Sequence, residues 1–185
     1  MCGDKPHLFH SHISSLQAQC DSEGWTVLLR RKANSSQQLS FRRTWSEYQH
    51  GFEDLNTEFW YGLRIIHCLT TREQVDLQVD LKYDNGTEHT STYQHFIVDG
   101  SENKYTLHIG RLLEPIPGHD NMACNNERPF TTNDSDNNVL NHGNCAHGSG
   151  DGHGRGGGWW FGVCSCSVLT SPHPHISIGM RVEAM

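Results

Sequence analysis

The 185-residue sequence lacks the features that mark several large classes of protein. No apolar run reaches the roughly 18 to 20 residues of a membrane-crossing helix, so no membrane insertion is expected. Basic residues number only 14 against 21 acidic ones, and the net charge of −7 argues against nucleic acid as a partner. The N-terminus has no basic patch followed by an apolar core, so no signal peptide is visible. The chain is therefore expected to start within a mature protein or at an incomplete N-terminus.

Enzyme motifs are missing as well. The sequence contains no recognisable nucleophile motif, no H-E-x-x-H pair of zinc-binding histidines and no phosphate-cradling glycine loop. These motifs are the usual sequence signs of a nucleophile, a catalytic metal or a bound phosphate. We therefore predict that the protein is not an enzyme.

Cysteine is present, but its spacing does not suit zinc. The seven cysteines include no C-x-x-C pair, and the single C-x-C has no second half. A disulfide framework fits better and implies an oxidising, extracellular compartment. The odd count predicts at least one free thiol or an intermolecular bridge. Sequons at Asn34 and Asn85 predict glycosylation, whereas a third at Asn133 lies inside the acidic loop described below.

The N-terminal half alternates strands and short helices. With 35% hydrophobic residues, the chain can build one domain with a real core. Apolar residues alternate over 25–29, which predicts a strand. The segment 44–52 predicts a helix with Thr44 as N-cap and Glu47 as its capping-box partner. A second amphipathic turn is predicted over 63–70, where apolar residues recur every three positions.

The middle of the sequence switches to a period of two. Apolar and polar residues alternate over 75–81, a pattern typical of a half-buried strand. Residues 84–86 form a tight-turn signal, and a second strand runs through 93–98, which predicts a hairpin. A third strand is predicted over 105–109.

Residues 115–174 are rich in Gly, Asn, Asp, His and Pro and have few apolar residues to bury. Such a segment keeps a shape only if a disulfide or a bound ion fixes it. Within it, Asp134, Asp136 and Asn138 alternate, so their oxygens can turn to one side and close around a hard cation. Calcium is the natural candidate, because it accepts six to eight oxygens in a tolerant geometry. The alternative is a solvated Asx-turn loop without an ion.

Histidines occur in and beside the glycine-rich stretch 146–158, at His142, His147 and His153. Neutral imidazole suits zinc, copper or nickel, so a metal cluster is one interpretation. Glycine is costly to fix, and no cysteine pair lies at zinc-ligand spacing. A flexible loop is therefore favoured over a structural zinc site.

Three motifs in order resemble the end of a fibrinogen-related domain. FTTNDSDNN, GNCA and GGGWWFGVC are similar to the family's F-S-T-x-D-x-D-x-D, N-C-A and G-G-W-W-x-x-x-C. Upstream, GWTVLLRRK and FRRTWSEYQHGFEDLNTEFWYGL resemble G-W-T-V-x-Q-R-R and W-x-x-Y-x-x-G-F-G-x-x-x-x-E-F-W-L-G-L. The resemblance extends from Cys20 onward and implies an α+β fold. Its parts are a central twisted antiparallel sheet, which would include the strands over 75–109, short flanking helices and a loop-rich calcium and ligand subdomain.

The resemblance also divides the chain and pairs its cysteines. It implies an N-terminal segment at 1–23 and a domain at 24–185, with the subdomain at 115–174. The disulfides that it implies are Cys145–Cys164 and, by position, Cys2–Cys20. Three cysteines have no implied partner: Cys68, Cys124 and Cys166.

A calcium ligand set follows from the same resemblance. Family members use the second and third acids of D-x-D-x-D, here Asp136 and Asn138, together with main-chain carbonyls assigned to Leu140 and His142. Asn138 replaces a carboxylate with a neutral amide, so binding in the weaker range of extracellular modules is expected. Alternatively, Asp134 and Asp136 form the acidic pair.

The ligand pocket of carbohydrate-binding members lies beside the second cysteine of the disulfide. The resemblance implies a cis peptide bond between Val163 and Cys164, a feature typical of working sites. Ser165 follows, where many relatives have His. Nearby bulk is expected from three aromatic residues: Trp159, Trp160 and Phe161. Such a place suits an N-acetyl group, whose methyl needs an apolar cup and whose oxygen needs fixed donors.

The resemblance is incomplete after Cys164. Relatives continue through N-L-N-G and G-I-x-W-x-x-W-K-G-x-x-Y-S-L, whereas CSCSVLTSPHPHISIGMRVEAM runs almost directly into a strand over 176–182. The absent segment carries tyrosines and tryptophans that build the far wall of the pocket. The domain is thus truncated relative to the family.

The resemblance implies two classes of function. The first is a secreted, calcium-stabilised lectin-like domain that recognises acetylated glycans in innate immunity, similar to ficolins and tachylectins. The alternative is a protein-interaction domain of the angiopoietin, tenascin or fibrinogen kind, with an extracellular or cell-surface protein as partner, or a variant with a lost sugar pocket. A homo-oligomer is compatible with either class.

Overall fold

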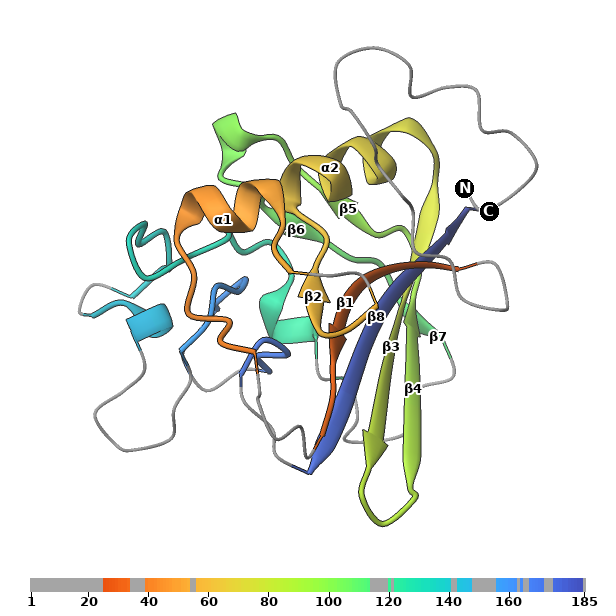
Figure 1. Cartoon of the computed structure of the whole chain (residues 1–185). Helices are drawn as coiled ribbons and strands as arrows, with labels where there is room; N and C mark the ends of the chain where they lie inside the picture. The colour runs from red at the N-terminus through yellow and green to blue at the C-terminus, as the bar shows by residue number, and fades with distance from the viewer. Residues whose placement is uncertain are drawn as a thin grey trace.

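A six-stranded antiparallel sheet organises the structure, which is a computed structural model. The helices α1 and α2 and the loop-rich segment from residue 122 onward lie on one side of this sheet (Figure 1). The strand order is β2-β1-β8-β3-β4-β7. The residues that the structure describes are 25–33, 39–53, 56–113, 120, 122–140, 143–147, 156–162, 164, 167–171 and 175–184.

Three neighbouring strands form the middle of the sheet. β3 (Val75–Tyr83) and β8 (Ile176–Ala184) pair along their whole length, and β8 pairs on its other side with β1 (Thr26–Arg31). The strands predicted over 25–29, 75–81 and 176–182 are therefore confirmed. Because β8 bonds to both β1 and β3, the last strand of the chain closes the centre of the sheet.

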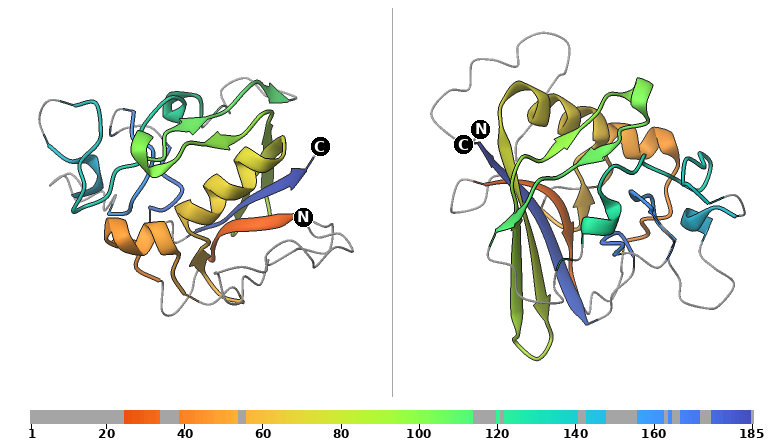
Figure 2. Two further views of the ribbon diagram at one scale, coloured as in Figure 1. Left: turned by 90° about the horizontal axis from the view of Figure 1, so that it is seen from above. Right: turned by 180° about the vertical axis from the view of Figure 1, so that it is seen from behind.

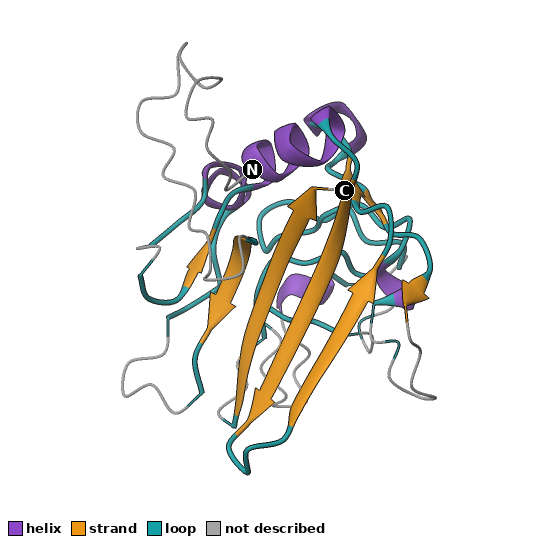
Figure 3. Ribbon diagram, turned by 90° about the vertical axis from the view of Figure 1, so that its right-hand side faces the viewer, coloured by secondary structure: helices purple, strands orange, loops and turns teal. Residues whose placement is uncertain are grey.

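The hairpin predicted around residues 84–86 is confirmed. β4 (Glu88–Tyr93) follows the turn and pairs with β3. β7 (Leu112–Leu113) pairs only with the last two residues of β4, and β2 (Phe59–Trp60) forms the opposite edge. Figure 3 shows the hairpin turn at the end of the sheet that lies away from the helices.

Tyr93 ends β4 in the central sheet, but the prediction that the rest of 93–98 and the strand over 105–109 join this sheet is wrong. β5 (Ile97–Val98) and β6 (Leu107–His108) pair with each other in a separate two-stranded sheet. The chain leaves the central sheet after β4, where His95 takes a left-handed backbone conformation with φ 54°. A residue in that region interrupts an extended strand.

Both predicted helices are confirmed. α1 (Trp45–His50) begins with a complete capping box, in which Thr44 accepts the Glu47 amide and Glu47 accepts the Thr44 amide. α2 (Leu63–Arg72) buries its apolar face, and the two helices lie near each other when viewed from above (Figure 2). Across the described residues, no helix has the length and apolar character to cross a bilayer. Three short 3-10 turns are η1 (Ser101–Asn103), η2 (Ala123–Asn125) and η3 (Cys145–His147).

A buried aromatic cluster joins the sheet to the loop-rich segment. The ring of Phe130 lies 5.0 Å from Trp160, 5.1 Å from Tyr48 and 5.9 Å from Trp60, measured between centroids. All four side chains are fully buried. They come from α1, β2 and two separate stretches of the loop-rich segment, so the core holds distant parts of the chain together.

Candidate ion and ligand site

A disulfide closes the loop-rich segment. Cys145, in η3, is bonded to Cys164, and their Cα atoms lie 5.1 Å apart. Cys145 is buried, whereas Cys164 is partly exposed. The predicted pairing is confirmed, and it fixes the end of the candidate calcium loop to the stretch that was expected to carry the ligand pocket.

The remaining cysteines behave differently from one another. Cys124 is also disulfide-bonded, and its partner lies outside the described residues. Cys68, on α2, is a free and partly buried thiol. The predicted Cys2–Cys20 bridge falls outside the described residues. The loop-rich segment thus has a second covalent bridge that the resemblance does not supply.

The base of the acidic loop is hydrogen-bonded to a buried tryptophan. The amide of Thr131 donates to the carbonyl of Trp159 at 2.9 Å, and the amide of Trp159 donates back at 3.0 Å. Asn137 then donates from Nδ2 to the carbonyl of Phe130 at 2.9 Å and from its amide to Thr131 Oγ1 at 3.1 Å. The base of the loop is therefore fixed by the core.

Asn144 holds the far side of the loop. Its Nδ2 donates to the carbonyl of Thr132 at 2.8 Å, and its Oδ1 accepts the amide of Ala146 at 2.8 Å. Sequence reasoning missed Asn144 and Asn137 as structural residues. Both lie in the motifs that carry the family resemblance, so the signal was present in the sequence.

Asp134 faces helix α1. Its Oδ1 accepts the amide of Trp45, the first residue of α1, at 2.8 Å and the hydroxyl of Thr132 at 2.8 Å. Amides in the first turn of a helix have no partner within the helix, and a carboxylate there also suits the helix dipole. Asp134 is therefore a bridge between the loop and α1.

Asp136 and Asn138 face each other across the loop. Asp136 Oδ1 accepts the Asn138 amide at 3.3 Å and also the side-chain Nδ2 of Asn138. That same Nδ2 donates to the carbonyl of Gly143 at 3.3 Å, while Asn138 Oδ1 accepts the Leu140 amide at 2.8 Å. A carboxylate oxygen and a carbonyl oxygen thus converge on one donor group.

This arrangement fits a hard cation with a small ligand set. Carboxylate, amide and main-chain oxygens are the ligands that calcium takes, and Asp136 is exposed enough to exchange its hydrogen bonds for an ion. The oxygen and nitrogen of an asparagine amide occupy nearly equivalent positions, so rotation of Asn138 would turn its oxygen toward the same point. Gly143, which sequence reasoning missed, adds a main-chain carbonyl. Among the other predicted ligands, Leu140 is exposed and His142 lies outside the described residues.

The histidine alternative has one described member. His147 is exposed, and its Nε2 lies 2.8 Å from the carbonyl of Asn133. His153, like His142, lies outside the described residues. Within the part of the chain that the structure describes, no three His, Cys, Asp or Glu side chains are grouped as a metal site. An ion in the acidic loop would therefore rely on amide and carbonyl oxygens beside Asp136.

The aromatic residues predicted near the ligand pocket lie in the core. Trp159, Trp160 and Phe161 are each 0% exposed. Trp160 Nε1 donates to the carbonyl of Tyr105 at 2.7 Å, and its ring lies 5.1 Å from that of Trp159. They therefore belong to the core and form no exposed ring wall. Val163, Ser165 and the predicted cis peptide bond fall outside the described residues.

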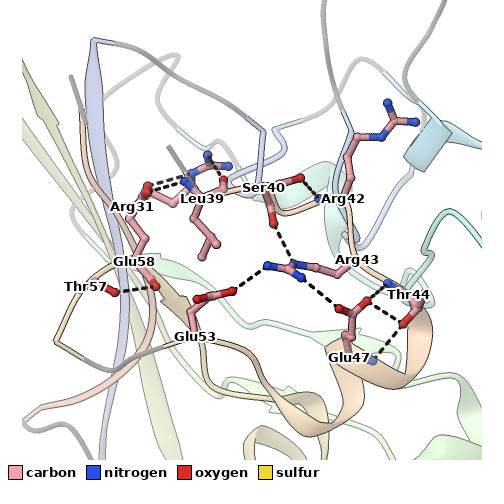
Figure 4. Close-up of polar contacts among 10 residues, drawn as sticks. All are labelled: Arg31, Leu39, Ser40, Arg42, Arg43, Thr44, Glu47, Glu53, Thr57 and Glu58. Carbon is pink, nitrogen blue, oxygen red and sulfur yellow. Dashed lines mark hydrogen bonds and ion pairs between the residues drawn. The ribbon is translucent and has the colours of Figure 1, made fainter. Parts of the chain in front are cut away.

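A buried arginine connects the sheet to the stretch after the disulfide. Figure 4 shows this residue, Arg31, with its partners Leu39 and Glu58. Arg31, on β1, is 4% exposed and donates to the carbonyl of Thr170, while Glu58 lies 3.8 Å from its Nε. Its guanidinium also lies 4.3 Å from the centre of the Phe41 ring. Burial lowers the pKa of Arg31, and the Glu58 carboxylate opposes that shift. Figure 4 also shows Arg43, whose guanidinium contacts Glu47 at 3.1 Å and Glu53 at 2.7 Å beside α1.

Residues 10–175 match the family described as the C-terminal globular domain of fibrinogen beta and gamma chains. The chain belongs to the fibrinogen-related domain family. This family consists of recognition domains and not of enzymes, in agreement with the missing catalytic motifs.

Fibrinogen-related relatives are identical to this chain at about a third of the aligned residues. Human fibroleukin is 38% identical over 139 residues, which cover 71% of this chain and 31% of fibroleukin. Human ficolin-3 is 35% identical over 144 residues, which cover 76% of this chain and 46% of ficolin-3. Human angiopoietin-2 is 32% identical over 133 residues, covering 70% and 26% respectively. The chain thus spans less than half the length of each of these relatives.

Solved structures show the same fold. The fibrinogen-like globe domain of human ANGPTL2 superposes with a TM-score of 0.79 at 27% identity, over 90% of this chain and 85% of that domain. Lamprey fibrin D-dimer, solved with the peptide Gly-His-Arg-Pro-amide, gives a TM-score of 0.71 at 23% identity, covering 89% and 63%. These likenesses confirm the predicted fibrinogen C-terminal-like α+β fold.

Proposed function

We propose that this chain is an extracellular recognition domain that holds one calcium ion at Asp136 and binds N-acetylated carbohydrate beside Cys164. The bonded state of Cys145, Cys164 and Cys124 supports an oxidising, extracellular location, because such bridges are rare in the reducing cytosol. The kinship with ficolin-3 supports recognition as the class of activity.

The convergence of Asp136 Oδ1 and the Gly143 carbonyl on the Asn138 amide is the observation that carries the calcium proposal. A bound calcium ion would supply two positive charges at this point. Among the described residues, Asp136 supplies the carboxylate at this point, since Asp134 bonds to Trp45. With a single carboxylate, weak binding in the 10⁻⁴–10⁻³ M range of extracellular modules is expected.

The Cys145–Cys164 disulfide connects the acidic loop to the stretch that is proposed to bind the sugar. Asn138 and Gly143 precede Cys145, and Cys145 is bonded to Cys164. An ion that fixes the loop at Asp136 would therefore limit the movement of Cys164. The Trp159–Phe161 core supports the same stretch from below. Calcium is thus expected to strengthen sugar binding without touching the sugar.

Calcium binding is tested by thermal unfolding with and without millimolar calcium. The wild type should gain stability with calcium, and Asp136→Ala should lose most of that gain. Glu102→Gln, which removes an exposed carboxylate from η1 on another part of the domain, is the matched control and should keep the gain. If the wild-type melting curves with and without calcium coincide, the loop is a simple turn that binds no calcium.

Sugar binding is tested on an N-acetylglucosamine resin in calcium buffer, with a glucosamine resin that lacks the acetyl group as control. Retention on the first resin only, with release by free N-acetylglucosamine, is the expected result. Release by a chelator would show the dependence on calcium. Folded protein that flows through both resins would reject the lectin proposal.

A protein partner is the second candidate, and exposed apolar residues favour it. Val139 is 52% exposed and Leu140 is 37% exposed, side by side in the acidic loop. Adjacent apolar side chains on the surface mark a candidate contact with another protein. The absence of an exposed ring among residues 159–161 points the same way. Val139→Ser should then weaken binding to cell surfaces and leave sugar retention unchanged.

A further inference from the structure

The turn of the β3–β4 hairpin carries an Asn85-Gly86-Thr87 sequon at the free end of the sheet, away from the helices (Figures 1 and 3). All three residues are exposed. Gly86 has φ +83°, and a Cβ built there would meet no atom within 4 Å. The turn therefore projects into open space, where an attached group would displace nothing.

The side chain of Asn85 is held with its amide nitrogen free. Its Oδ1 accepts the amide of Thr87 at 2.9 Å, which forms an Asx turn. Throughout the described residues, no hydrogen bond uses Asn85 Nδ2. The nitrogen that N-glycosylation modifies is thus not engaged by the described residues, while the threonine that the sequon requires is bonded to the same side chain.

We infer that Asn85 carries an N-linked glycan that covers the hairpin turn and the outer edge of β4. In the transfer step, Asn85 Nδ2 forms a bond to the anomeric carbon of an oligosaccharide carried on a polyprenyl diphosphate. The bond from that carbon to the phosphate oxygen breaks, the diphosphate leaves with the electron pair, and one amide proton is released. The inference rests on the proposed extracellular route and is independent of calcium and sugar binding.

The other described sequon offers a poorer acceptor. Asn133 is exposed, but its carbonyl accepts His147 Nε2 at 2.8 Å and Asn144 Nδ2 at 3.3 Å. It also precedes Asp134, which bonds to α1. A glycan at Asn133 would share its space with the candidate ion loop. Asn34 lies outside the described residues.

A glycan at Asn85 would lie next to the open edge of β4. β7 pairs with β4 only at Thr92 and Tyr93, so in the described structure residues 88–91 have no strand partner on their outer side. Open edges are templates for pairing with another chain, and proteins usually block them. A glycan at the adjacent turn would hinder a second copy from reaching this edge.

The first experiment maps the modification. The full chain is expressed behind a secretory leader in eukaryotic cells, and intact mass and glycopeptides are measured before and after treatment with peptide N-glycosidase. Asn85 should be modified in the wild type. Asn85→Asp, which keeps the acceptor for Thr87, should lose that glycan, and so should Thr87→Ala. Thr87→Ser should keep it, as should Asn133→Gln. Secreted, disulfide-bonded protein with unmodified Asn85 would overturn the inference.

The second experiment tests the covering role with the matched pair Thr87→Ala and Thr87→Ser. Neither change touches Asn85 or the carbonyl of residue 87, which accepts the Tyr83 amide. In sedimentation velocity, Thr87→Ala should shift to larger species with rising concentration, whereas Thr87→Ser should match the wild type. Identical sedimentation of the two glycoforms would overturn the covering role. A failure to bind calcium or sugar would leave both glycan results unaffected.

Discussion

The sheet half of the molecule, residues 25–113 and 175–184, and its loop-rich half, residues 122–171, are stabilised in different ways. In the sheet half, strands pair over many consecutive residues, and apolar side chains repeat on one face. In the described part of the loop-rich half, the regular elements are the turns η2 and η3. Single side chains such as Asn137 and Asn144 bond the backbone there instead.

The difference shows where each half is vulnerable. A pair of strands repeats the same backbone hydrogen bond many times. When one contact is lost, the neighbouring bonds still hold the strands together. A loop that depends on individual disulfides, a helix contact and tightly packed glycines has no such reserve. Changes in the loop-rich half should therefore have local and distinct effects, and matched changes in the sheet should be milder.

Removal of the Cys145–Cys164 bridge should have the largest effect. The bridge closes a loop across 19 residues, and such a crosslink stabilises a domain by about 3 kcal/mol, chiefly by restricting the unfolded chain. The double variant Cys145→Ser with Cys164→Ser should unfold at lower urea concentration. Hydrogen exchange should accelerate first in residues 122–147, while β3 and β8 stay protected. Uniform acceleration across the domain would contradict the division into two halves.

A methyl group at Gly158 should cost nearly as much. A Cβ at this position would lie 2.6 Å from Tyr48 Cε2 and 2.8 Å from Phe130 Cε1, so the aromatic cluster would have to shift. Overpacking of this kind costs about 1–3 kcal/mol.

Gly179→Ala is the matched change in the sheet half. Its added Cβ meets nothing closer than 3.9 Å, so the variant should unfold near the wild-type urea midpoint. Equal losses for Gly158→Ala and Gly179→Ala would show that the loop-rich half is no more tightly fitted than the strands.

The sheet half could be predicted from sequence because its signals are local. Alternation over 75–81 and the turn at 84–86 give β3 and the hairpin directly, and the pairing of Thr44 with Glu47 gives the start of α1. The departure at His95 could not be predicted, because no glycine or proline marks that residue. A left-handed histidine depends on its tertiary surroundings.

The candidate site could be predicted only in part. The motifs gave the Cys145–Cys164 bridge, but alternation alone suggested that Asp134, Asp136 and Asn138 face one way. The turn in which the Thr132 amide bonds to the Ser135 carbonyl redirects Asp134 toward α1. Alternation predicts a shared face only in an extended chain. The direction of a loop side chain depends on distant residues such as Trp45.

Changes at Asp134 separate a structural carboxylate from an ion ligand. Asp134→Ala removes the acceptor for the Trp45 amide and should cost about 1 kcal/mol, as the loss of a helix cap does. Asp134→Asn keeps an oxygen acceptor and should cost less. Both variants should retain the stabilisation by calcium in thermal unfolding. If Asp134→Asn abolishes the calcium response, the alternative acidic pair of Asp134 and Asp136 is the ligand set.

The smallest expected effect is a dependence on pH at the start of α1. Hydrogen bonds from the Thr44 amide and hydroxyl, helped by Arg43, lower the pKa of Glu47 from its ordinary value of 4.5. A lowered folded-state pKa means that the ionised form is stabilised by folding. The stabilisation of the folded state by ionised Glu47 is therefore complete above pH 4.5, and it is lost as the pH falls through the lower folded-state pKa.

Because the Glu47 side chain is 40% exposed, solvent screens this contribution to about 0.3 kcal/mol. Glu47→Gln keeps the capping geometry but cannot ionise, so its urea midpoint should change less between pH 6 and about pH 3 than that of the wild type. The calcium response at neutral pH should be the same in both proteins, since Glu47 bonds to Thr44 and Arg43, whereas Asp136 bonds to Asn138. An equal fall of the urea midpoint in both proteins would mean that the acid sensitivity arises from other groups. The carboxylates of the loop-rich half would then be the next residues to substitute.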